Sequence, residues 1–289
     1  MFDPVRIAQN RWHNLRQSLI MLAGMALLLG AIGWVLAGPA AVVWSAGAGL
    51  VILMLGPIAP PAFILRLYRA RALEPDQAPE LFALTAELTR RAGLSRPPRL
   101  YDLPGPIMQA FSVGHPNDAA IAISQGILTR LGMREVAGIL AHEISHIAHN
   151  DLGVMSIADV MARLTRTFSY IGIFLIILNL PLIAAGQAHV AWFGVGLLTA
   201  APSLSVLLQL ALSRAREFDA DLGAVELTGD PEALALALTK IEAQQRNPWE
   251  RHLFPMGRPP QPSLLRSHPG NRERIARLHE LIPAPQRWM

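Results

Sequence analysis

The segment His142-Glu143-Ile144-Ser145-His146 is the part of the chain best equipped for chemistry. Residues four apart on a helix share a face, so His142 and His146 can direct ring nitrogens at one metal ion. Glu143 lies beside them and can take a proton from a water that the metal acidifies. The motif predicts a hydrolytic site with one Zn²⁺ per chain. The alternative is a helix with two surface histidines and an unrelated glutamate.

A catalytic zinc needs a further ligand, because such sites usually have three protein ligands and one open position. Glu217 is the candidate, in the run Glu217-Phe218-Asp219-Ala220-Asp221. Glu217 and Asp221 share a face of a predicted helix, so we expect Glu217 to bind zinc. We expect Asp221 to accept the N–H of a ligand histidine and fix its tautomer. Asp219 points away from that face and is expected to be solvated.

Composition excludes several other kinds of site and partner. The 289 residues contain no cysteine, which excludes disulfides, thiolate zinc sites, Fe–S clusters and cysteine nucleophiles. The net charge is +4, and Lys240 is the single lysine among the 25 basic residues. These arginines form no dense run with interleaved aromatic residues, so we expect no nucleic-acid partner.

Two long uncharged segments indicate a membrane protein. The chain is 52% hydrophobic and 16% charged, and residues 17–65 and 167–213 contain no Asp, Glu, Lys or Arg. A spanning helix needs about 20 apolar residues, so each segment can hold two spans and a turn. Buried core helices or a cleaved signal peptide explain such paired segments less well. The four predicted spans cover residues 18–37, 40–55, 168–185 and 190–212, with turns at Gly38-Pro39 and 186–189.

The distribution of arginine predicts the orientation in the membrane. Arginines flank the outer ends of both hairpins, and neither hairpin turn carries Lys or Arg. The positive-inside rule therefore places both termini and the active site in the cytoplasm. The predicted organisation is residues 1–65 with the first hairpin, 66–166 with the sheet and zinc helix, 167–213 with the second hairpin, and 214–289 with the third ligand.

The predicted cytoplasmic part combines helices with a small antiparallel sheet. Helices are expected over residues 78–92, 133–149, 213–227, 231–243 and 271–281, with a loop over 247–262. Strands are expected over residues 99–102, 109–114 and 119–123. The second strand alternates polar and apolar residues, and as an edge strand it could pair with extended substrate backbone. Its proposed substrate-binding residues are Gln109, Ala110, Phe111, Ser112 and Val113.

These motifs together resemble those of the membrane gluzincin metallopeptidases, which include the bacterial HtpX-type proteases and the eukaryotic CAAX prenyl proteases. The zinc helix, the Glu217 run and the apolar hairpin between them carry the resemblance, and four spans are closer to the HtpX type. Residues 109–114 are similar to the family's Asn-Ala-Phe-Ala-x-Gly strand, with Gln109 in place of the usual asparagine. Ser267-His268-Pro269 is similar to its Thr/Ser-His-Pro element.

The resemblance implies a mainly α integral membrane protein with a gluzincin-like α+β protease domain. It implies zinc-dependent cleavage of membrane or unfolded polypeptides, as part of the stress response and protein quality control. The expected partners are polypeptide substrates and the lipid bilayer, and the implied location is a bacterial-type inner (plasma) membrane. We expect His268 to stabilise the oxyanion, with an ordinary loop histidine as the alternative. Arg274 can pair with a site carboxylate or lie solvated on its helix, and we favour the second.

Three other functions stay open at the level of sequence. One is a catalytically silent membrane scaffold, which has no need for Glu143. Another is a protease of narrow specificity, for instance for lipid-modified C-termini. The third is a zinc hydrolase of a non-peptide substrate, which the predicted edge strand disfavours. The sequence does not determine the oligomeric state.

Overall fold

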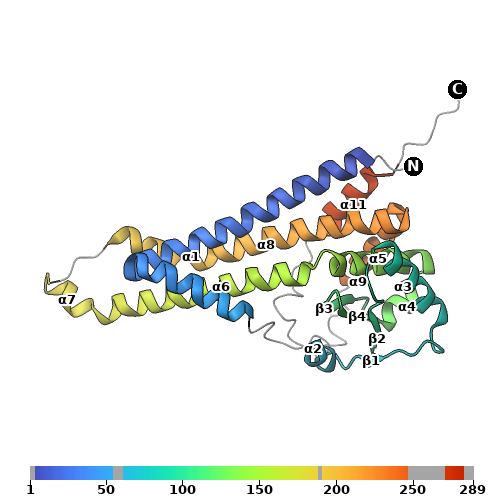
Figure 1. Ribbon diagram of the computed structural model, residues 1–289, viewed down its shortest axis with the longest axis horizontal. Coiled ribbons are helices and arrows are strands. Elements are labelled where there is room, and N and C mark those ends of the chain that lie inside the picture. Colours follow the sequence, from blue (N-terminus) through green and yellow to red (C-terminus); the bar gives the residue numbers. More distant parts are fainter. Residues whose placement is uncertain (1–3, 55–60, 188–190, 247–270, 283–289) are drawn as a thin grey trace. The chain divides into compact units, whose positions relative to one another are not determined.

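The computed structural model describes residues 4–54, 61–187, 191–246 and 271–282. The chain divides into two compact units. The catalytic unit comprises Met1–Leu15, Ala59–Gly153 and Arg214–Met289, and the helical unit comprises Arg16–Ile58 and Val154–Ser213. The elements labelled in Figure 1 are α1 (Pro4–Met54), α2 (Pro61–Leu67), β1 (Arg71–Ala72), α3 (Pro79–Arg91), β2 (Arg99–Leu103), β3 (Ala110–His115), β4 (Asp118–Ser124), α4 (Gln125–Arg130), α5 (Met133–Ala148), α6 (Asp151–Leu178), α7 (Leu180–Ala184), α8 (Trp192–Thr228), α9 (Pro231–Arg246) and α11 (Asn271–Glu280).

Helix α1 is interrupted where the sequence predicts the first turn. Ala37 and Gly38 have non-helical backbone angles, and the φ of +67° at Gly38 is one that glycine adopts without a steric penalty. Pro39 follows at once and begins the next helical stretch, a position where its missing N–H costs nothing. The chain reverses direction at this break (Figure 1).

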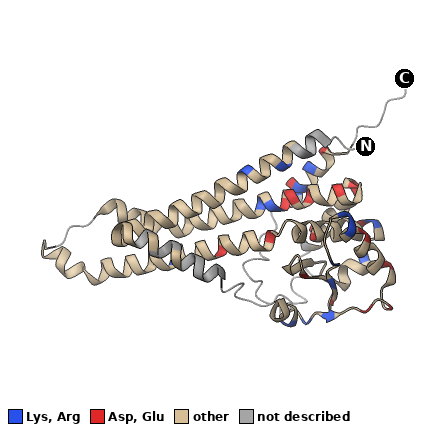
Figure 2. Ribbon diagram, in the orientation of Figure 1, with Lys and Arg blue, Asp and Glu red and all other residues tan. Residues whose placement is uncertain are grey.

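Three helices within the described residues are long and apolar enough to cross a membrane: Gln9–Ala40, Asp151–Leu178 and Trp192–Thr228. Figure 2 shows long stretches of these helices without charged residues. In the helical unit, Ile32 packs with Leu198 and Ala201 in a buried apolar cluster. The predicted span over 40–55 is helical as far as Met54, but most of its side chains lie outside the described residues. Four spans therefore stay a prediction.

The sheet in the catalytic unit is mixed, so the prediction of an antiparallel sheet is wrong. Its strand order is β1-β2-β4-β3. Strands β3 and β4 form the expected antiparallel hairpin, with Phe111 opposite Ala122. Strand β4 then lies beside β2 and runs parallel to it, with Leu100 opposite Ile121. Hairpin signals in a sequence predict which consecutive strands pair, but they do not predict the partner at the other edge of β4.

Helix α5 is fixed by the core of the catalytic unit. It contacts β3, α3 and α9, and its Leu140 and Ile144 are completely buried with Ile121 and Ile123 of β4. The approach to α9 is close, because a Cβ on Gly138 would lie 3.1 Å from the backbone of Leu234. The helix that carries both histidines is therefore held on several sides by packed side chains.

Side-chain hydrogen bonds cap the starts of α4 and α9. The Ser124 hydroxyl accepts the N–H of Ile127 and caps α4. The carboxylate of Asp230 accepts the N–H of Ala233 at 3.0 Å and caps α9. Arg134 forms an ion pair with Asp230, and this pair joins the beginnings of α5 and α9.

Candidate active site

His142 and His146 lie one turn apart on α5, as their spacing predicts. Their Nε2 atoms are 3.1 Å apart, and the side chains are 4% and 13% exposed. His149 ends the helix, with its Nδ1 lying 2.8 Å from the carbonyl oxygen of Ser145. Asn150 then adopts a φ of +51°, and α6 begins at Asp151. The sharp break brings the start of α6 next to the histidines.

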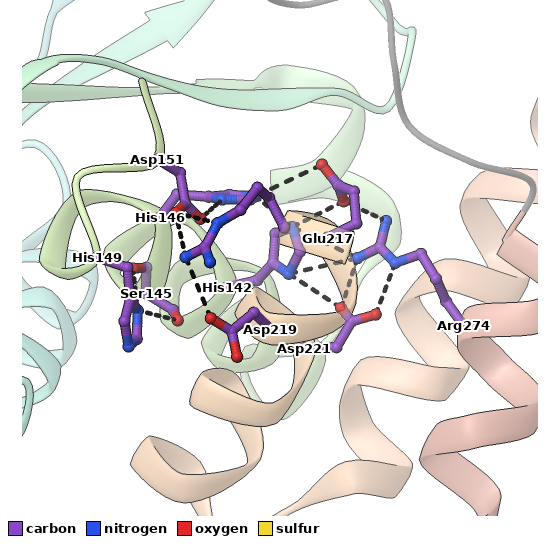
Figure 3. A network of polar contacts seen from close by, with 10 residues as sticks. His142, Ser145, His146, His149, Asp151, Glu217, Asp219, Asp221 and Arg274 are labelled. Atoms are coloured by element: carbon purple, nitrogen blue, oxygen red, sulfur yellow. Dashed lines mark hydrogen bonds and ion pairs between the residues drawn. The ribbon is translucent and has the colours of Figure 1, made fainter. Parts of the chain in front are cut away.

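Glu217 on α8 completes a group that could hold a metal ion (Figure 3). Its Oε2 lies 3.4 Å from His142 Nε2, and its Oε1 lies 3.6 Å from His146 Nε2. One ligand atom from each of the three residues lies within 4.8 Å of the others. Two imidazole nitrogens and a carboxylate oxygen, largely buried, form the set of protein ligands that suits a catalytic Zn²⁺.

The close approach of α8 to α5 depends on a glycine. A Cβ on Gly223 would lie 2.1 Å from the Ser145 hydroxyl oxygen and 2.9 Å from the Ser145 Cβ. Without a side chain at this position, the two helices pack in direct contact. Glu217, less than two turns earlier on α8, can then reach the histidines of α5.

A carboxylate orients each imidazole. His142 Nδ1 donates to Asp221 at 3.0 Å, and His146 Nδ1 donates to Asp151 at 2.7 Å (Figure 3). Both Nε2 atoms are thereby directed toward Glu217, and each tautomer is fixed. The structure thus places Asp221 where the sequence predicts it. Asp151 is not among the predicted site residues, although an acidic residue directly after the predicted end of the zinc helix was an available signal.

The same carboxylates create a local field that favours positive charge. Burial by itself lowers the pKa of His146, but its hydrogen bonds with Asp151 and Glu217 outweigh burial and hold the pKa well above its ordinary value. The pKa of His142 is also raised, because Asp221 and Glu217 outweigh burial and two cationic neighbours. Groups that favour an imidazolium also favour a metal cation at the same place.

Arg274 of α11 belongs to the site, so the expectation that it lies solvated is wrong. Its side chain is 3% exposed. Its Nε and NH2 donate to the two oxygens of Asp221 at 2.8 and 2.6 Å, and its NH1 lies 3.1 Å from Glu217 Oε2. Asp221 and Glu217 raise the pKa of Arg274 further above its usual value, despite burial. The guanidinium balances the negative charge of both carboxylates and restrains Oε2 of Glu217.

Asp219 is also buried, so the expectation of a solvated carboxylate is wrong. Its side chain is 5% exposed, and its Oδ2 lies 3.1 Å from Arg216 NH2. Arg216 Nε donates to Asp151 at 2.6 Å. The helical face argument fails because α8 is enclosed on every side here, with every residue from 215 to 225 buried.

The sequence also predicts catalytic roles for Glu143 and His268. Glu143 lies on α5 directly after the first histidine, and its side chain is buried. This position is compatible with the predicted role of a base, which stays a prediction. His268 lies outside the described residues, so its predicted contact with the oxyanion stays a prediction as well.

The predicted substrate strand is an edge strand of the described sheet. β3 is last in the strand order, and the carbonyl of Gln109, just before it, accepts the N–H of Ser124. In an antiparallel pair, every second residue forms backbone hydrogen bonds with the partner strand. Since Gln109 bonds to Ser124, the odd-numbered residues of β3 direct their backbone N–H and C=O groups toward β4. The backbone N–H and C=O groups of Ala110 and Ser112 therefore point to the open edge.

Replacing Asp151 with asparagine is expected to weaken zinc binding by about 10–100-fold, as is typical for partners of metal-ligating histidines. The imidazole of His146 would lose the negative charge that orients it and increases its basicity. Competition with a chromophoric chelator would measure this change. Asp118→Asn is a matched control, because Asp118 is exposed at the end of the sheet and pairs with Arg99. Equal zinc affinity in Asp151→Asn and wild type would contradict the orienting role.

Two histidines from one helix and a glutamate from a second, with apolar helices in the same chain, define the class of membrane metallopeptidases. Residues 75–282 match the model of peptidase family M48, and the chain belongs to this family. A "Protease HtpX homolog" of Methylibium petroleiphilum is 30% identical over 93% of this chain and 98% of its own length. Another, of Paraburkholderia phytofirmans, is 34% identical over 75% of this chain and 79% of its own length.

A solved structure shows the same fold. The crystal structure of S. mikatae Ste24p superposes with a TM-score of 0.51 at 20% identity, covering 93% of this chain and 66% of that one. Family membership and long apolar helices establish a multi-pass membrane metalloprotease of the HtpX type. Its substrates are polypeptides, and its family requires a metal.

Proposed function

We propose that the protein is a zinc-dependent endopeptidase that cleaves membrane or unfolded proteins. The observation that carries this proposal is the convergence of His142 Nε2, His146 Nε2 and a Glu217 carboxylate oxygen in one buried group. The proposed stoichiometry is one Zn²⁺ per chain, held by these three residues. A bound Zn²⁺ would polarise the scissile carbonyl and lower the pKa of a water, which supplies the electrophilic part of hydrolysis.

The chain's own residues supply the proton transfers and the orientation. Glu143 takes a proton from the attacking water and passes it to the leaving amine, so its carboxylate is regenerated in each cycle. Asp151 and Asp221 keep both imidazoles in the tautomer that directs Nε2 toward the metal position. Arg274 lies 3.1 Å from Oε2 of Glu217, and Oε1 of Glu217 faces His146.

The open edge of β3 is the proposed position for the substrate backbone. An extended peptide could pair with the outward groups of Ala110 and Ser112, which fixes a chain without reading much of its sequence. Helix α5 packs against this strand, so the same elements position the histidines and the proposed pairing edge. Such pairing suits unfolded segments, and it favours a peptide over a non-peptide substrate.

Replacing Ala110 with proline is expected to raise the KM for an unfolded protein substrate by about 10-fold, the loss of roughly one hydrogen bond to the substrate. Proline removes an N–H that points to the open edge, and proline is tolerated on that side of an edge strand. Ala110→Val is the control, because it changes the side chain and keeps the N–H. Phe111→Pro is a poorer test, because Phe111 bonds to β4 and packs on Tyr68. An unchanged KM in Ala110→Pro would contradict strand pairing.

The proposed activity is tested by removing the metal and restoring it. Purified protein in detergent, stripped with a chelator, should not cleave an unfolded reporter protein and should recover activity as one zinc per chain is added. Mass spectrometry of the fragments would establish cleavage at internal peptide bonds. Zinc binding without cleavage of any unfolded substrate would instead favour the scaffold, or a protease restricted to substrates such as lipid-modified C-termini.

The proposed location is a bacterial-type inner membrane, with both termini and the active site in the cytoplasm. The arginines at the outer ends of the predicted hairpins support this orientation. A cytoplasmic active site would suit a role in quality control, since it would meet unfolded segments there. A reporter fused at Gly38 should lie outside the cytoplasm, and a cytoplasmic signal from it would contradict the orientation.

A further inference from the structure

We propose that the N-terminal helical segment, residues 9–15 of α1, helps to position the ligands of the metal site. In this proposal Arg11 is a positioning residue for the ligand His146, although it contacts neither the metal position nor a ligand. The proposal rests on the zinc site proposed above. Neither the metal motif nor the family model, which matches residues 75–282, includes this segment.

A continuous series of ionic contacts connects Arg11 to His146 within the catalytic unit. Asp151 Oδ2 lies 2.7 Å from His146 Nδ1, and Asp151 Oδ1 accepts a hydrogen bond from Arg216 Nε at 2.6 Å. Arg216 NH2 lies 3.1 Å from Asp219 Oδ2. The other oxygen of Asp219 lies 3.9 Å from Arg11 Nε. Each partner therefore lies between two others, so a shift of one side chain changes the position of the next.

The balance of charge explains why this series needs Arg11. Asp151 and Asp219 are both buried, and among the described residues Arg216 is the cation that contacts both carboxylates. No hydrogen-bond donor in the described part of the chain reaches Asp219 Oδ1, which is itself buried. Without Arg11, this carboxylate would compete with Asp151 for Arg216. Asp151 would then hold His146 less firmly.

Two further features hold the N-terminal segment in place. Arg11 NH2 donates to Glu226 at 2.8 Å, about two turns beyond Asp219 on α8. Asn14, one turn after Arg11, is 2% exposed. Residues Asn10, His13 and Asn14 also line a cavity of about 460 Å³ to which Asp221 contributes. The segment thus lies beside Asp219, and it shares this cavity with Asp221, the carboxylate that orients His142.

The test measures zinc retention in the full-length protein in detergent. Release of Zn²⁺ to a chromophoric chelator should be about 10-fold faster in Arg11→Gln than in wild type, at the lower end of the range for residues behind a metal ligand. Arg11→Lys keeps the charge and should retain most of the zinc. The absorption bands of bound Co²⁺ should also change in Arg11→Gln, because the orientation of His146 changes.

A double variant separates positioning from packing. Arg11→Gln/Asp219→Asn leaves no uncompensated buried carboxylate beside Arg216, since Glu226 is exposed, so its zinc release should return to within about 3-fold of wild type. Glu226→Gln is the matched control, since it alters the other partner of Arg11 and leaves the charge of Arg11 beside Asp219. The proposal is overturned if Arg11→Gln releases zinc like wild type, if the double variant is no better than Arg11→Gln, or if Glu226→Gln is as impaired. Wild type that binds no zinc would overturn the zinc site itself, which is a distinguishable result.

Discussion

Glu143→Gln is expected to lower kcat/KM for an unfolded protein substrate by about 10²–10⁴-fold, the usual contribution of a positioned general base. Glutamine has nearly the same shape as glutamate but cannot take the proton of the attacking water. Glu143 lies on α5 directly after His142, and its side chain is buried. Because the proposed ligands are unchanged, the variant should bind zinc as wild type does.

The measurement pairs zinc content with initial rates of reporter cleavage. Glu135→Gln is a matched control, since Glu135 lies on the same helix but caps its start and pairs with Lys240. That control should keep its activity, with some loss of thermal stability. Full activity in Glu143→Gln would contradict the proposed mechanism, and loss of zinc in Glu143→Gln would mean that Glu143 is needed for metal binding.

Glu217→Ala is expected to weaken zinc binding more strongly than the loss of an orienting residue does. Loss of a residue that orients a metal-ligating histidine weakens metal binding by about 10–100-fold. The variant removes one of three proposed ligands, and it also leaves Arg274 facing the His142 imidazole with one carboxylate fewer. Activity should fall in parallel and should recover in part at high zinc concentration. Chelator competition and cleavage rates at rising zinc concentration would measure both effects.

Asp219→Ala provides the comparison for Glu217→Ala. Asp219 is also a buried carboxylate on α8, but it contacts Arg216 rather than the histidines. Its loss should weaken zinc binding less than the loss of Glu217. Equal losses would remove Glu217 from the proposed ligands. Thermal unfolding of both variants would separate metal loss from loss of the fold.

Local sequence signals were sufficient for the centre of the site. The four-residue spacing of His142 and His146 needs only a helix to place both rings together, and Glu217 and Asp221 follow the same rule on α8. The helix starts at Ser124 and Asp230 were also predictable, because a cap acts within a few residues. Each of these features depends on residues only a few positions apart in the sequence.

The surrounding charges were not predictable, because their partners are distant in sequence. A helical face rule sends Asp219 to solvent, yet α8 is enclosed here, and Arg11 of the distant helix α1 lies 3.9 Å from Asp219. Arg274 follows Asp221 by 53 positions and becomes a site residue only when α11 packs into the catalytic unit. The parallel pairing of β2 and β4 was missed for the same reason, since it joins strands separated by β3.

The central claim is that His142, His146 and Glu217 together hold the metal. An anomalous X-ray difference map from crystals of the zinc-loaded protein, collected at the zinc edge, would test it most directly. One strong peak is expected about 2.0–2.2 Å from both Nε2 atoms and from a Glu217 carboxylate oxygen. A zinc peak bound by other residues, or none at these three side chains despite one zinc per chain in solution, would contradict it.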